Sequence, residues 1–130
     1  MSLLASTLLL AAALQAQNST EAGRFHVEHP TLLNAGFEWA ISGDANRNAS
    51  VSVEFRAVGD TAWRTALPLV RVGGENVYRR RENLDYTVPD GFAGAIMNLT
   101  PGTEYECRFQ LVDPDGAAGQ VSGALGRLTQ

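Results

Sequence analysis

Few residues in this chain combine chemical reactivity with a spacing that could form a site. The two histidines, His26 and His29, lie beside Glu28, and imidazole with carboxylate is a ligand combination that zinc accepts. A tetrahedral zinc site needs three or four convergent ligands, and the sequence has no third histidine. We therefore interpret these residues as part of a solvated leader strand and predict no metal site.

Asp44, Asn46 and Asn48 have the alternating oxygen spacing of a calcium-binding loop. Such a loop needs a glycine at its sixth position for a sharp turn and a glutamate at its twelfth as a bidentate ligand. In this chain those positions hold Ala49 and Phe55. The pattern therefore favours a polar connection between two strands over a calcium site.

Cys107 is the one cysteine, and so the one thiol nucleophile, in the sequence. It alternates with polar residues, in phase with Tyr105, Phe109 and Leu111, which is the pattern of a half-buried strand. A thiol that faces the core is poorly ionised. The sequence also lacks a G-x-S-x-G motif and a glycine-rich phosphate loop. We expect no catalytic residue, no cofactor and no enzymatic activity.

A run of three arginines could bind the carboxylates of an acidic polysaccharide, because guanidinium matches carboxylate in geometry and nearby aromatic rings can stack on sugars. Three acidic residues between positions 75 and 85 cancel most of the local charge, so a solvated loop is the competing and favoured interpretation. The candidate ligand-binding residues are Trp63, Tyr78, Arg79, Arg80 and Arg81.

Composition predicts one soluble domain that has no affinity for nucleic acid, since 130 residues carry a net charge of -4 and 45% of them are apolar. The apolar run Leu3–Leu14 predicts a secretory signal peptide over residues 1–16, cleaved after Ala16. Cleavage after Ala13, or a buried N-terminal helix, are the alternatives. We expect a secreted or periplasmic monomer with no membrane attachment after cleavage.

Period-two alternation recurs at Phe37–Ile41, Val51–Phe55 and Tyr105–Val112, with turn residues between these segments. Six or seven short strands in about 100 residues predict an all-β sandwich, whose last strand we place at residues 121–128. The segment 67–92 is irregular, and we favour a long, partly ordered loop with one short strand over a hairpin that pairs residues 70–78 with 84–88. The predicted core residues are Trp39, Phe55, Ile96, Leu99, Tyr105, Cys107 and Phe109.

One stretch of this sequence resembles the junction between strands E and F of fibronectin type III domains. It runs from Leu99 to Tyr105, with Ile96 three residues before it, and Trp39 matches the core tryptophan of the same family. The resemblance implies an immunoglobulin-like sandwich of about seven antiparallel strands, in which the Tyr105 hydroxyl bonds to upstream backbone. We expect a leader segment at residues 17–30 and the domain at residues 31–130.

A narrower resemblance is to the N-terminal fibronectin-like module of secreted bacterial proteins that continue into a right-handed parallel β-helix, some of them polysaccharide-lyase-like. The residues concerned are Gly36–Asn48, Trp63–Arg71 and Phe92–Gly116. It implies a non-catalytic accessory module that spaces, docks or presents a neighbouring domain or extracellular protein. The alternative is a carbohydrate-binding module that recognises acidic polysaccharide through the 67–92 loop.

Overall fold

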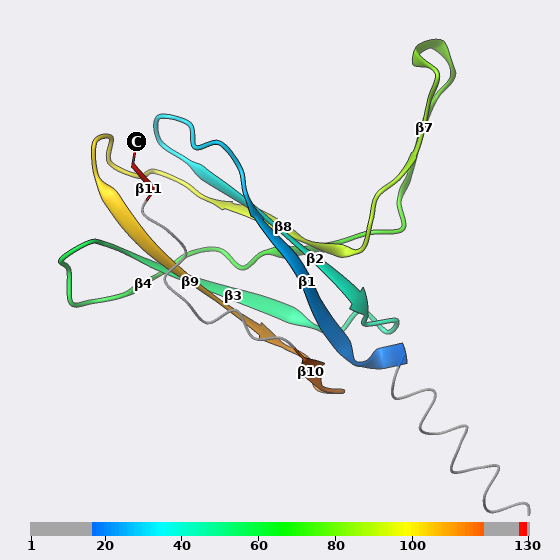
Figure 1. Ribbon diagram of the computed structural model, residues 1–130, viewed down its shortest axis with the longest axis horizontal. Helices are drawn as coiled ribbons and strands as arrows, with labels where there is room; N and C mark the ends of the chain where they lie inside the picture. Colours follow the sequence, from blue (N-terminus) through cyan, green and yellow to red (C-terminus); the bar gives the residue numbers. More distant parts are fainter. Residues whose placement is uncertain (1–16, 119–127, 130) are drawn as a thin grey trace, which may run out of the picture.

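Two β-sheets pack face to face in the computed structural model, which describes residues 17–118 and 128–129 (Figure 1). The first sheet has the order β10-β1-β2-β8-β5, with β10 Ala117–Ala118, β1 Thr20–Val27, β2 Ala35–Gly43, β8 Gly91–Ile96 and β5 Val70–Val72. The second has the order β11-β9-β3-β4, with β11 Leu128–Thr129, β9 Glu104–Val112, β3 Ser50–Ala57 and β4 Arg64–Thr65. Apart from the parallel pair β1 and β10, neighbouring strands are antiparallel, so the chain is an all-β sandwich.

The core lies between the sheets and is built from the alternate residues that point inward from each strand. The rings of Phe37 in β2 and Phe109 in β9 meet across it, with their centroids 4.8 Å apart. Trp39 is fully buried, and Phe55 is the most exposed of the predicted core residues at 8%. The other five, Ile96, Leu99, Tyr105, Cys107 and Phe109, are at most 3% exposed. Strand alternation therefore identified the inward face.

The backbone before β9 is fixed by the hydroxyl group that the resemblance assigned to this role. The Thr100 N–H donates a hydrogen bond to the Tyr105 hydroxyl over 2.9 Å. Hydrogen bonding to Thr100 lowers the pKa of Tyr105 below its ordinary value. Because Tyr105 is 3% exposed, this bond is shielded from water and holds the turn at Pro101 and Gly102 against the sheet.

Residues 17–30 do not form a separate leader, because Thr20–Val27 is β1 and pairs with β2 inside the first sheet. The register shifts between Ala22 and Phe25, so two residues of β1 lie in a bulge. Phe25 packs edge-on against Trp39, with centroids 5.6 Å apart. The bulge breaks the period-two pattern, which explains why alternation did not reveal this strand.

The segment 67–92 contains three strands, where we expected one short strand within a loop. β5 pairs with β8 and extends the first sheet. β6 (Asn76–Arg79) and β7 (Leu84–Thr87) pair only with each other among the described strands, and the 3-10 turn η1 (Arg80–Glu82) joins them. The hairpin alternative was therefore closer to the structure, although its first strand begins at residue 76 rather than 70.

Two other expectations concern residues outside the described part of the chain. The signal peptide at residues 1–16 lies there entirely. Of the strand expected at residues 121–128, Leu128 belongs to β11, which pairs with β9, whereas residues 121–127 lie outside the described residues.

Candidate functional site

A hairpin arm, defined here as residues 75–88, projects from the edge of the sandwich (Figure 1). Every residue of β6, η1 and β7 is exposed, so these elements bury no core of their own. A two-stranded hairpin is only marginally stable in isolation. An arm of this kind needs either a firm base or a bound partner to stay ordered.

The arm has two chemically different faces, because cross-strand partners share a face and neighbouring residues alternate. Val77 pairs with Tyr86, and Arg79 with Leu84, which gives one face three apolar side chains. The other face carries Asn76 and Tyr78, opposite Thr87 and Asp85. There the Asn76 amide donates a hydrogen bond to the Asp85 carboxylate over 3.0 Å. We call the face that carries Val77, Leu84 and Tyr86 the apolar face of the arm.

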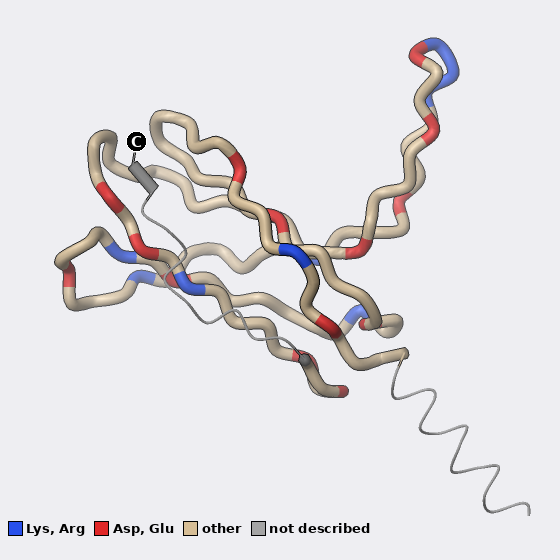
Figure 2. The backbone as a smooth tube through the Cα atoms, viewed as in Figure 1, with Lys and Arg blue, Asp and Glu red and all other residues tan. Residues whose placement is uncertain are grey.

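The tip of the arm, residues 79–82, is positively charged (Figure 2). Asn83 closes the turn in the left-handed conformation, at φ 50°, which asparagine tolerates better than most residues. Arg79 forms an exposed ion pair with Glu82 over 3.6 Å. No carboxylate within residues 17–118 and 128–129 lies at ion-pair distance from Arg80 or Arg81.

A partly buried arginine fixes the arm where it leaves the sandwich. The Nε of Arg71 donates to the fully buried Asp44 over 2.6 Å, and its Nη1 donates to Asp90 over 3.0 Å. Burial lowers the pKa of Arg71, but its hydrogen bonds to Asp44 and Asp90 outweigh burial and raise it overall. Since Asp90 is two residues after the arm, this charged network ties the end of the arm to the first sheet and to the β2–β3 turn.

A second set of contacts fixes the start of the arm. Arg47 donates to the Gly73 carbonyl over 3.0 Å, and the Gly73 N–H donates to the Glu75 carboxylate over 2.7 Å. Hydrogen bonds from the backbone N–H groups of Glu75 and Gly73 lower the pKa of Glu75. Gly73 has φ 132°, and a Cβ there would lie 2.6 Å from the Cα of Asp90. Glycine is therefore required where the two ends of the arm meet.

A groove crosses the outer face of the first sheet beside the base of the arm. One part, a cavity of about 150 Å³, is lined by Tyr86 and Val88 of the arm and by Ala93 of β8. A shallower part is lined by Arg24 and His26 of β1 and by Glu28, which follows β1. Both parts share Glu38 and Ala40 of β2. We call these two parts together the groove. It joins the base of the arm to β1.

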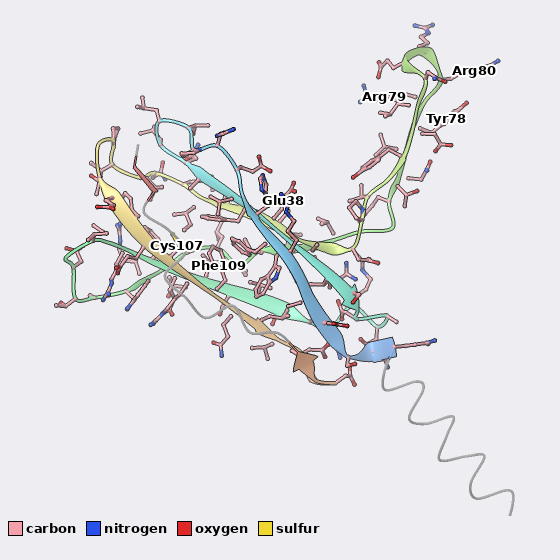
Figure 3. All side chains as sticks on the ribbon, in the orientation of Figure 1. Glu38, Tyr78, Arg79, Arg80, Cys107 and Phe109 are labelled. Carbon is pink, nitrogen blue, oxygen red and sulfur yellow. The ribbon has the colours of Figure 1, made fainter. Side chains whose placement is uncertain are left out.

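The floor of the groove consists of very small residues. The outward pairs between β2 and β8 are Gly36 with Ala95, Glu38 with Ala93 and Ala40 with Gly91. Of these six residues only Glu38 has a side chain larger than a methyl group, and Figure 3 shows it on the sandwich, apart from the labelled tip residues of the arm. A polypeptide could therefore approach the sheet backbone closely at this point.

The five candidate ligand-binding residues do not form one site. Tyr78, Arg79, Arg80 and Arg81 are all on the arm, and Figure 3 labels the first three. Trp63 instead precedes β4 of the second sheet, where the guanidinium groups of Arg56 and Arg108 lie 4.4 and 4.2 Å from its ring centroid. A third ring, that of the exposed Tyr86, shares the apolar face of the arm, whereas Tyr78 is on the opposite face. No planar platform joins the three rings.

The chemical candidates are held in structural contacts. Burial raises the pKa of Cys107 to about 11, which keeps its thiol protonated at neutral pH. Asp44 accepts hydrogen bonds from the backbone N–H groups of Asn48 and Ala49. The Asn46 and Asn48 amides both donate to Asp115, which lowers the pKa of that carboxyl. The calcium-like spacing thus forms a hydrogen-bonded connection around Asp115.

The histidines also lack the surroundings of a metal site. His26 lies 3.5 Å from Glu28 on the exposed side of β1. Across the described residues, no group of three or more His, Cys, Asp or Glu side chains is arranged to hold a metal ion. The same part of the chain contains no helix long and apolar enough to span a membrane. Among the described residues, the exposed arm and its groove are features that the packing of the sandwich does not explain.

Comparison with known proteins adds no assignment. No family model matches the chain, and no curated protein has significant sequence similarity to it.

Proposed function

We propose that this chain is a non-catalytic, fibronectin type III-like accessory module that docks or presents a partner, and that the arm and groove are its docking surface. The observation that carries the proposal is an arm with no buried residue in its strands, with apolar side chains on one face and a base fixed by a buried ion pair. Because the base of the arm is already fixed before binding, the arm loses little conformational freedom when it binds a partner, which favours association.

The fibronectin-like part of the proposal is supported by the sandwich architecture and by the hydrogen bond between Thr100 and Tyr105. The non-catalytic part is supported by the protonated, buried thiol of Cys107. We also propose export after removal of residues 1–16. Intact mass of the exported protein tests this, since retention of Met1 would contradict it.

Excision of the arm tests the docking role. The Gly74 N–H donates to the Val88 carbonyl over 2.8 Å, so the two ends of the arm are adjacent and a short Asn-Gly turn can replace residues 75–87. The shortened protein should keep its urea unfolding midpoint, because the excised strand residues are exposed. In medium from the secreting cells, the parent protein should elute as a larger complex than the shortened protein. Elution of both as free chains would contradict a docking arm.

Binding of a carboxylate-bearing polysaccharide is a second candidate, favoured by Arg80 and Arg81, which form no ion pair with any described residue. The scatter of the aromatic rings argues against it, because Trp63 is remote from the arm and Tyr78 and Tyr86 lie on its opposite faces, so these rings do not form one stacking surface for a sugar. Affinity electrophoresis in polygalacturonate and in a neutral glucan distinguishes the two functions. Retardation by polygalacturonate alone, abolished by Arg80→Ala with Arg81→Ala, would favour the polysaccharide.

A further inference from the structure

We propose that the partner is a second copy of this chain, with the arm of each copy lying in the groove of the other. This inference rests on the proposed function, because it identifies what the arm binds. Each copy offers one arm and one groove, so a two-fold symmetric dimer satisfies both surfaces without leaving one free to extend a chain of copies.

The apolar face of the arm extends beyond the chain's own groove. Tyr86 lines that groove, whereas Val77 and Leu84 are not among the residues that line it. They are 37% and 39% exposed, and Tyr86 itself remains 50% exposed. Apolar side chains exposed together on a projecting element are typical of an interaction surface. The arm therefore offers a second molecule three apolar side chains that its own sheet does not cover.

The receiving surface fits a flat, two-stranded element. The Gly, Ala and Val side chains on the outer faces of β2, β8 and β5 leave the floor of the groove low. β6 has four residues, and at about 3.3 Å per residue it is about 13 Å long, which spans about three strands at their spacing of about 4.8 Å. An arm crossing β8 and β2 would thus bring its tip to β1.

Charge distinguishes a second copy from other partners. Three arginines and one glutamate leave the tip, residues 79–82, with two net positive charges. On the outer faces of β1 and β2, and at Glu28 just after β1, three glutamates, Glu21, Glu28 and Glu38, outnumber Arg24. Glu21 and Glu38 form no ion pair with any described residue. Within the described residues, one chain therefore carries both a cationic tip and two glutamates without an ion-pair partner, Glu38 on the floor of the groove and Glu21 on the outer face of β1.

Analytical ultracentrifugation of the purified protein over about 0.1 to 100 µM tests the proposal, because this range brackets micromolar dissociation constants. We expect a concentration-dependent change from the mass of one chain to that of two. Leu84→Ser with Tyr86→Ser should weaken the dimer about tenfold or more. The matched control, Tyr78→Ser on the opposite face, should leave the dissociation constant unchanged. A single-chain mass at every concentration would overturn the dimer.

Exchange of charges gives a sharper test. Arg80→Glu with Arg81→Glu, and separately Glu38→Arg with Glu21→Arg, should each weaken self-association about tenfold or more, because like charges then face each other. An equimolar mixture of the two variants should associate again, since each arm then meets a groove of opposite charge. Circular dichroism on each variant checks its fold. Failure of the mixture to associate would overturn the proposed arrangement.

Excision of the arm tests the docking function, whereas ultracentrifugation of the purified protein tests the dimer, so the two proposals can fail separately. A single-chain mass in ultracentrifugation, with a larger complex in secretion medium that depends on the arm, would refute the dimer and retain the docking function. Elution as a free chain in that medium, with or without the arm, together with a single-chain mass at every concentration in ultracentrifugation, would refute both the docking function and the dimer.

Discussion

Replacing Asp44 with alanine should unfold the sandwich far more readily than loss of an exposed carboxylate. The Asp44 side chain is fully buried and accepts hydrogen bonds from Asn48, Ala49 and Arg71. Alanine leaves two backbone donors unpaired and removes the closest counter-ion of Arg71, whose side chain is 11% exposed. Arg71 then retains its hydrogen bonds to Asp90 and the Val72 carbonyl and its position over the Phe92 ring.

The expected size of this effect follows from burial. Each unsatisfied buried donor costs about 1 to 3 kcal/mol, and breaking a buried ion pair costs about 3 to 5 kcal/mol. These costs overlap because they share one carboxylate, so we expect a total loss of about 3 to 5 kcal/mol. In a domain of this size that lowers Tm by about 12 °C or more.

Urea unfolding followed by tryptophan fluorescence measures the loss. The matched control is Glu54→Ala, because Glu54 also contacts an arginine, Arg108, over 2.6 Å but both side chains are at least 36% exposed. Water screens the exposed pair, so the control should shift the midpoint only slightly. Equal shifts for Asp44→Ala and Glu54→Ala would refute the claim that a buried ion pair holds the base of the arm.

Three further substitutions test the core. Phe109→Ala, which removes a ring that is 1% exposed, should cost about 3 to 5 kcal/mol in urea unfolding, and a loss below about 1 kcal/mol would mean that the ring does not pack between the sheets. Tyr105→Phe should cost about 1 to 3 kcal/mol because the Thr100 N–H loses its acceptor, and an unchanged midpoint would count against that bond. Burial raises the pKa of Cys107 in the folded protein to about 11, above its ordinary value of 9.0. The thiol of the unfolded protein therefore loses its proton at a lower pH, and the free energy of unfolding should fall as pH rises from about 9 to 11. Cys107→Ala should lack that part of the alkaline loss, and identical pH profiles would contradict a buried thiol.

The sequence identified the parts of the fold that follow from strict alternation. Phe37, Trp39 and Phe109 lie inward because their strands are regular and half-buried, and period two is visible in such strands. The contact between Thr100 and Tyr105 was predictable from the family resemblance, because it depends on a short local motif. Contacts of this kind need no knowledge of the rest of the chain.

The arm was harder to predict because alternation in a two-sided, exposed hairpin does not separate apolar from polar residues cleanly. Val77 and Tyr78 are adjacent, so one apolar residue occurs on each face. The turn at Asn83 also lacks glycine, which is the usual sign of a left-handed residue in a hairpin. The glycine pair at residues 73 and 74 marked the base of the arm, but alone it indicates only a turn.

The contacts that fix the arm could not be read from the sequence, because they join residues far apart in the chain. Asp44 and Arg71 are separated by 27 positions, and nothing local to either residue indicates the other. The spacing of Asp44, Asn46 and Asn48 suggested a metal loop. In the structure Asp44 is buried at the base of the arm, and the Asn46 and Asn48 amides donate hydrogen bonds to Asp115. Trp63 was grouped with Tyr78 by residue type alone, yet Trp63 precedes β4 of the second sheet and Tyr78 lies in β6 of the arm.

Photo-cross-linking in the secreting cells tests the central claim most directly, since it asks which surface of the module contacts a partner. A photoreactive residue replaces either Tyr86, on the apolar face of the arm, or Ser52, which is exposed on β3 of the second sheet. The account predicts one discrete adduct from position 86 and none from position 52, whether the adduct contains a second copy or another protein. Equal labelling from both positions, or no adduct from position 86, would contradict it.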